Sequence, residues 1–186
     1  VAAAVRGRID GLERRTVIGT PDATGLPDGE ASAVIAETLL TGLSDPGKEA
    51  VLRETARILR PGGCAAFHEL AIVDDPWARG ALPLRDLLAD PARGGLRPLN
   101  VRGWRDLVAP AGLEVVGASL GTFTPPDLAE ALRDAAGRDK LLIAARLMLP
   151  GRVAPRWRAV AYELDAHAAE LASIVLVVRR PVLALA

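Results

Sequence analysis

A helical pattern, a Pro-Gly-Gly turn and a short apolar run follow one another in the first half of this chain, and they constrain its fold most. Asp45 is expected to cap the helix, with Pro46 at its first position. Pro61 cannot continue a helix, and Gly62-Gly63 permits the positive φ of a tight turn. Since residues 64–70 resemble a strand covered on both faces, the unit predicts a parallel α/β sheet. The apolar helix face follows the helical period at Val51, Leu52, Thr55, Ile58 and Leu59.

The rest of the chain alternates apolar strands with helical patterns, which predicts one α/β domain over residues 1–186. Residues 74–100 predict a long loop with one helical turn near Leu84–Leu88. Asn100 is expected to cap a helix that runs through Ala109. Strands are expected near 15–20, 33–37, 64–70, 113–123 and 173–180, with further helical segments at 127–149 and 156–172.

The composition excludes several classes of protein. Lys plus Arg and Asp plus Glu number 23 each, so no net charge draws the chain to nucleic acid or to an anionic membrane. A single cysteine, Cys64, excludes an internal disulfide and favours a reducing compartment, so we expect a cytoplasmic location. No apolar run approaches the ~20 residues of a membrane span. No metal site is predicted.

Four motifs in order resemble those of class I S-adenosylmethionine (SAM)-dependent methyltransferases. Arg57-Ile-Leu-Arg-Pro-Gly-Gly63 is similar to the signature "R-V-L-(K/R)-P-G-G", and Asp22-Ala-Thr-Gly-Leu-Pro27 is similar to "D-A-x-x-L-P" after the third strand. Residues 33–37 resemble the fourth strand, and residues 104–116 resemble the helix-"AGF"-strand passage. The chain departs from the family at 30–34, where the usual aromatic residue and aspartate are absent.

The resemblance implies a Rossmann-like sheet whose last strand is antiparallel, with residues 124–172 as a helical insertion before it. It also implies an incomplete sheet. The family's glycine-rich loop and its ribose-binding acid should lie N-terminal to Val1, and a valine in place of an initiator methionine suggests a fragment or a processed chain. We therefore expect the 186-residue chain alone neither to bind SAM appreciably nor to methylate a substrate.

The same resemblance indicates which residues contact SAM. It implies that the Asp22 carboxylate accepts a hydrogen bond from the adenine amine and that the backbone N–H of Ala23 reaches a ring nitrogen. A turn aspartate bonded to its own backbone is the alternative for Asp22. Ala36 and Glu37 would line the methionine end of the cofactor, where Glu37 either binds the ammonium group or caps the segment that follows.

His68 and Glu69 end the fifth strand of the resembled fold and are the candidate catalytic residues. Histidine is the usual general base near neutral pH, and transfer to a hydroxyl acceptor needs such a base. The alternative is a structural histidine between apolar neighbours. The insertions at 74–100 and 124–172 are expected to cover a substrate pocket or, as the commoner outcome for an apolar helix face, to be plain core.

These observations favour a SAM-dependent methyltransferase that acts on a small molecule, with the 124–172 helices forming a lid or a homodimer surface. A non-catalytic methyltransferase-like scaffold or subunit is the alternative. A nicotinamide dehydrogenase is a distant third, because its glycine fingerprint is missing as well. The sequence does not separate oxygen, nitrogen and carbon acceptors.

Overall fold

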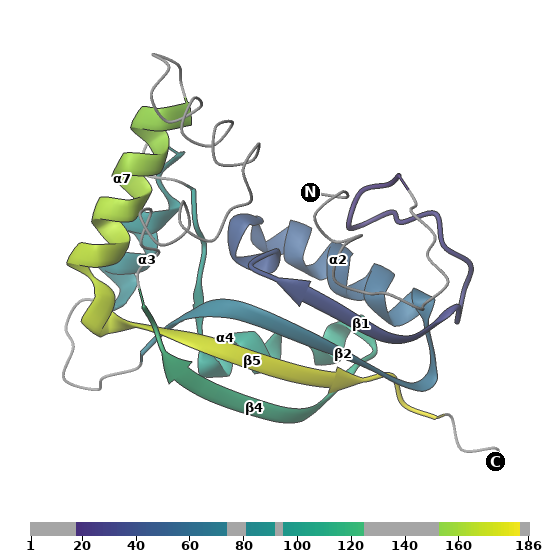
Figure 1. Ribbon diagram of the computed structural model, residues 1–186. Helices are drawn as coiled ribbons and strands as arrows, with labels where there is room; N and C mark the ends of the chain where they lie inside the picture. The colour runs from purple at the N-terminus through teal and green to yellow at the C-terminus, as the bar shows by residue number, and fades with distance from the viewer. Residues whose placement is uncertain (1–17, 74–80, 92–94, 125–152, 183–186) are drawn as a thin grey trace, which may run out of the picture.

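The structure is a computed structural model that describes residues 18–73, 81–91, 95–124 and 153–182 (Figure 1). Its helices and strands alternate along the chain as the sequence predicts. In chain order they are β1 (Ala31–Glu37), η1 (Leu40–Gly42), α2 (Asp45–Ile58), β2 (Leu59–Ile72), α3 (Ala81–Ala89), β3 (Leu99–Asn100), α4 (Val101–Asp106), η3 (Ala109–Ala111), β4 (Glu114–Thr122), α7 (Val153–Ala166), η4 (Ala168–Glu170) and β5 (Leu171–Arg179).

The strands form one sheet in the order β1-β2-β5-β4, with the short β3 paired to the end of β2. β1 and β2 are parallel and are joined by α2, whereas β5 is antiparallel to both β2 and β4. This topology confirms the predicted α/β class with its antiparallel last strand. In Figure 1, β5 lies between β2 and β4, and α3 and α7 stand together at one end of the sheet.

Two apolar clusters hold these layers together. In the larger one, α2 and α4 pack against one face of the sheet, where Leu52 and Trp104 meet Phe67 and Ile174. In the smaller one, α3 and α7 pack on the ends of β2 and β5 through residues that the helical period places on their inner faces. The buried members of this second cluster are Leu70, Ile72, Leu84, Leu88, Leu164 and Leu171.

The start of α2 differs from the prediction. Ser44, not Asp45, is the N-cap, because its backbone is extended and its hydroxyl accepts a hydrogen bond from the N–H of Gly47 at 3.3 Å. Asp45 instead lies in the first turn, where its carboxylate bonds Lys48 Nζ at 2.9 Å and Arg85 Nη2 at 2.7 Å. The carboxylate therefore links α2 to α3. With Ser44 as the cap, Pro46 is the second helical residue and not the first, the position that was predicted.

Other helix and strand boundaries also differ from the prediction. β2 begins at Leu59, directly after α2, because the Pro-Gly-Gly segment continues the strand with an irregular register opposite β1. The predicted loop at 74–100 contains the nine-residue helix α3. The strand expected near 15–20 is reduced to an isolated bridge at Thr20, with residues 15–17 outside the described part. The helical segment at 127–149 also lies outside it, whereas α7 begins at Val153 and ends at Ala166.

Gly62 has a φ of +78°, as the turn signal predicts. Because a Cβ is disfavoured in this left-handed region, we expect Gly62→Ala to lower the free energy of unfolding by about 1–2 kcal/mol. Gly42→Ala is the matched control, since Gly42 has no positive φ and a Cβ there would have no neighbour within 4 Å. Urea denaturation of both variants measures the difference, and equal stability would contradict the argument.

Candidate functional site

A cavity of about 540 Å³ opens at the carboxyl ends of β1 and β2, the edge at which α/β sheets bind ligands. The amino end of β5, the end of β4 and the inner side of α7 complete its wall. Its wall combines hydroxyl groups, aliphatic side chains and the ionisable residues of the two strand ends. The lining residues are Glu37, Thr38, Thr41, His68, Glu69, Leu70, Leu96, Thr122, Phe123, Thr124, Val160, Leu164 and Ser173.

His68 and Glu37 lie side by side at the mouth of this cavity. They are register partners in the parallel pair β1–β2, so their side chains point to the same face of the sheet. His68 Nδ1 lies 3.6 Å from Glu37 Oε1, and the two side chains are 48% and 76% exposed. A protonated imidazole would therefore have a carboxylate partner in reach, and both groups remain accessible to a ligand.

Glu69 points to the opposite face and is only 3% exposed. Its Oε1 accepts hydrogen bonds from the backbone N–H groups of Leu39 and Leu40, at 3.1 and 2.9 Å. Its Oε2 accepts from the N–H and the hydroxyl of Thr41, at 2.8 and 2.7 Å. The carboxylate therefore fastens η1 to β2, and both of its oxygens are engaged.

The backbone between β1 and η1 is also fixed. Thr38 has a φ of +51°, unusual for a residue with a side chain, and its N–H donates to the carbonyl oxygen of His68 at 2.8 Å. Ala36, one residue before Glu37, pairs with Phe67 inside the sheet and does not line the cavity. The carboxyl end of β1 is thus a firm edge from which Glu37 projects.

The Asp22–Ala23 turn lies outside this cavity lining. Ala23 bridges Thr20 through two backbone bonds, with its N–H donating to Thr20 O at 3.0 Å and its carbonyl accepting from Thr20 N at 3.3 Å. Both Asp22 and Ala23 are exposed. The structure thus brings Glu37, His68 and Glu69 to one pocket and leaves Asp22 and Ala23 on a separate loop.

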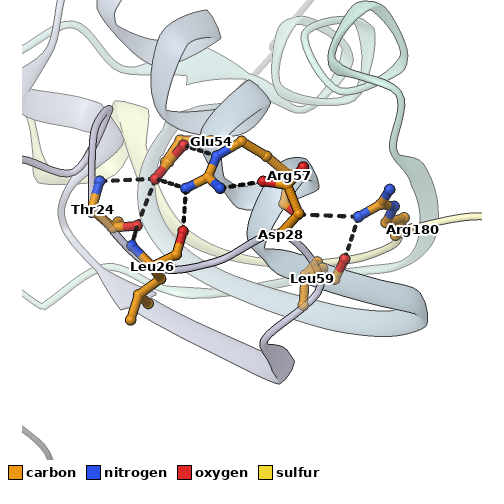
Figure 2. A network of polar contacts seen from close by, with 7 residues as sticks. All are labelled: Thr24, Leu26, Asp28, Glu54, Arg57, Leu59 and Arg180. Carbon is orange, nitrogen blue, oxygen red and sulfur yellow. Dashed lines mark hydrogen bonds and ion pairs between the residues drawn. The ribbon is translucent and has the colours of Figure 1, made fainter.

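A polar network ties this loop to α2, as Figure 2 shows. Glu54 accepts hydrogen bonds from the N–H and hydroxyl of Thr24, and from the Arg57 guanidinium at 2.7 and 2.8 Å. Arg57 also donates to Leu26 O at 2.7 Å and pairs with Asp28. The sequence marked Arg57 as the first residue of the Arg57–Gly63 motif, and its bonds to Glu54 and to the loop were not predicted. The i,i+3 spacing of Glu54 and Arg57 on the predicted helix is the sequence signal that could have indicated this ion pair.

The network perturbs the ionisation of its members. Hydrogen bonds from Arg57 and then from Thr24 outweigh the opposing effect of burial and lower the pKa of Glu54 to about 2. The bonds to Glu54 and Asp28 raise the pKa of Arg57. Both groups are therefore charged throughout the physiological range.

A pH dependence follows from the lowered pKa of Glu54. A carboxylate whose pKa is lower in the folded state stabilises the fold above its unfolded pKa of about 4.3, and this contribution is lost as the pH falls towards about 2. The stability difference between the unmodified protein and Glu54→Gln should therefore shrink from pH 6 to pH 2. Denaturant titrations at several pH values measure it, with Glu49→Gln as the exposed control on the same helix. A difference that is independent of pH would contradict the prediction.

Two comparisons give no match: no family model matches the sequence, and no curated protein matches it. In the described residues, no group of three or more His, Cys, Asp and Glu side chains could hold a metal ion. Among the helices in the described ranges, none has both the length and the apolar character that a membrane crossing needs.

Solved structures share the fold. The [4+2]-cyclase SpnF superposes with a TM-score of 0.65 at 20% identity, covering 97% of this chain and 60% of its own. A Bacillus halodurans protein assigned as a methyltransferase gives 0.59 at 14% identity, covering 96% and 76%. A geranyl diphosphate methyltransferase in complex with SAM gives 0.53 at 13%, covering 96% and 62%. The chain therefore has the fold seen in class I methyltransferases and spans about 60% of the cyclase it matches.

Proposed function

We propose that this chain forms the acceptor-binding part of a SAM-dependent methyltransferase whose substrate is a small molecule. The observation that carries the proposal is the cavity at the strand ends, with the paired side chains of Glu37 and His68 at its mouth. The shared fold supports it, because the solved structures with this fold include methyltransferases. Val160 and Leu164 of α7 line the cavity, which supports a role for this helix as its wall or lid.

The residues of this chain suit different parts of the cofactor. The exposed Glu37 carboxylate suits the ammonium group of the methionine end, beside the Ala36 backbone. Asp22 is free to face the adenine amine, whereas the Ala23 N–H would have to exchange its bond to Thr20 for one to the ring. SAM, when bound, supplies an electrophilic methyl group. Since that electrophile needs only alignment and deprotonation of the acceptor, the protein supplies position and a base.

In this proposal His68 is the general base and Glu69 is its structural support. The imidazole is half-exposed at the cavity, where it can take a proton from an acceptor hydroxyl, and Glu37 would stabilise the imidazolium that forms. Glu69 is already hydrogen-bonded through both oxygens, so it holds η1 and the strand end in place.

His68→Gln is expected to lower kcat/KM for methyl transfer by about 10²–10⁴-fold, because the acceptor loses its base. The dissociation constant for SAM should stay within about twofold, since the imidazole contacts the acceptor in this scheme. Steady-state kinetics and calorimetric titration measure the two quantities. Cys64→Ala, on the same strand but outside the cavity lining, is the control. Unchanged turnover with an unchanged pH profile would remove His68 from the mechanism.

The second candidate is a protein with this fold that does not transfer methyl groups. It would be either a non-catalytic methyltransferase-like subunit or an enzyme for another reaction. The observation in its favour is that a solved structure with this fold is a [4+2]-cyclase. The candidates are separated by calorimetric titration with SAM, followed by transfer of labelled methyl to small-molecule acceptors. Both measurements use the intact protein, with whatever precedes Val1, because the 186-residue chain alone is not expected to bind SAM. Binding and transfer support the methyltransferase. Failure of the intact protein to bind SAM contradicts the methyltransferase and leaves the second candidate.

A further inference from the structure

The loop that carries Asp22 and Ala23 has little apolar burial to hold it. None of residues 18–30 is buried, and only Thr24, Leu26 and Gly29 are even partly covered. Gly25 and Gly29 have φ angles of +72° and +68°, so the loop contains two left-handed backbone conformations that glycine adopts more readily than other residues. A loop of this composition needs polar contacts to keep one conformation.

α2 supplies these contacts at successive positions of the loop. Glu54, 8% exposed, accepts from Thr24 N at 2.8 Å, and Arg57 donates to Leu26 O at 2.7 Å and pairs with Asp28. The Arg57 carbonyl in turn accepts from Gly29 N at 3.0 Å. Residues 24, 26, 28 and 29 are therefore each bonded to Glu54 or Arg57, which lie a single helical turn apart on α2. Figure 2 shows the bonds of Thr24, Leu26 and Asp28.

The C-terminal end of α2, which carries Arg57, is in turn hydrogen-bonded to Arg180. Arg180, directly after β5, donates to Arg57 O at 3.1 Å and to Leu59 O, and its own backbone pairs with Gly62 and Gly63. The end of α2 is thus fixed to the sheet. Thr24 is the first loop residue bonded to α2, and it directly follows Ala23. The Asp22–Ala23 turn can therefore move little relative to this helix.

We propose that Glu54 and Arg57 are positioning residues that hold residues 24–29 in place and thereby set the affinity of the Asp22–Ala23 turn for the adenine end of the cofactor. The inference rests on the proposed function. It assigns the pair to cofactor binding and not to the chemical step, because neither side chain lines the cavity beside His68.

The test uses SAM as the probe and the intact protein, with whatever precedes Val1, because the 186-residue chain alone is not expected to bind SAM. Glu54→Gln and Arg57→Lys should each raise the dissociation constant for SAM by about 10- to 100-fold, since each removes charge-assisted bonds to the loop. At saturating SAM, kcat should stay within about twofold. Amide hydrogen exchange at Thr24 and Gly29 should accelerate at least tenfold in the same variants. Glu49→Gln, whose exposed side chain pairs with Arg53 at 3.4 Å, should change none of these quantities.

A variant in the loop guards against loss of folding. Thr24→Val leaves the Glu54–Arg57 pair intact and removes the two bonds of the hydroxyl, which donates to Glu54 and accepts from Leu26 N at 3.2 Å. It should raise the dissociation constant about threefold to tenfold in a fully folded protein. Faster exchange with an unchanged dissociation constant would overturn this proposal and leave the proposed function standing. An unmodified intact protein that does not bind SAM would overturn the proposed function, and this proposal with it.

Discussion

Glu69→Ala is expected to lower the free energy of unfolding by about 3–5 kcal/mol. The alanine would leave the N–H groups of Leu40 and Thr41 and the Thr41 hydroxyl without their acceptor in a buried site. Each unpaired buried donor costs about 1–3 kcal/mol, and relaxation of η1 recovers part of the total. Chemical denaturation followed by circular dichroism measures the loss.

Glu37→Ala is the matched control, because its carboxylate ends the neighbouring strand and is 76% exposed. We expect it to change the stability by less than about 0.5 kcal/mol. Glu69→Gln, which keeps one acceptor oxygen, should fall between the two. If Glu69→Ala were as stable as the control, the hydrogen bonds would contribute little, and a catalytic use of this carboxylate would regain support.

Trp104→Ala is expected to cost about 3–5 kcal/mol, the second large effect. The indole of α4 is 1% exposed in the main core cluster, and its Nε1 donates to the carbonyl of Leu70 at 3.1 Å. Lys48 Nζ lies 5.9 Å from the ring centroid and adds a cation–π contact. The substitution therefore leaves a cavity and removes the donor to a buried strand carbonyl.

Trp104→Phe separates these contributions. It keeps most of the apolar volume but not the indole N–H, so a loss of about 1–2 kcal/mol is expected. Tyr162→Ala, in which a side chain 71% exposed is removed from α7, should change the stability by less than about 0.5 kcal/mol. Urea denaturation of the three variants gives the comparison. A loss for Trp104→Ala no larger than that for Tyr162→Ala would contradict the packing argument.

The sequence predicted the elements whose signals are local. α2 and β2 followed from the helical period and the Pro-Gly-Gly turn, and Asn100 caps α4 as expected, with its side chain 2.7 Å from Gly103 N. Only one turn of α3 was predicted, near Leu84–Leu88, because Pro83 and the surrounding Pro, Gly and Arg residues conceal the short period of the full helix. Its inner face packs on Leu70 and Leu164, and such tertiary packing is not visible in a window of sequence.

In the candidate site, too, local features could be predicted from the sequence and contacts between distant residues could not. Strand ends were predictable, so Glu37 and His68 were named before the structure placed them 3.6 Å apart. Which of two adjacent residues faces the cavity was not predictable, because successive side chains of a strand alternate and the register depends on both strands. The partners of Glu54 were also hidden, since Thr24 is 30 positions away in sequence.

The place of β5 in the sheet has a consequence for how the protein is synthesised. In the described part of the chain, β4 is paired with β5, and β5 also covers the free edge of β2. β1, α2 and β2 can assemble as soon as they leave the ribosome, because they are neighbours in sequence. β4 leaves the ribosome before its partner β5, so its apolar side chains stay unpaired until Arg179 has been translated. A chaperone would be of most use during this interval.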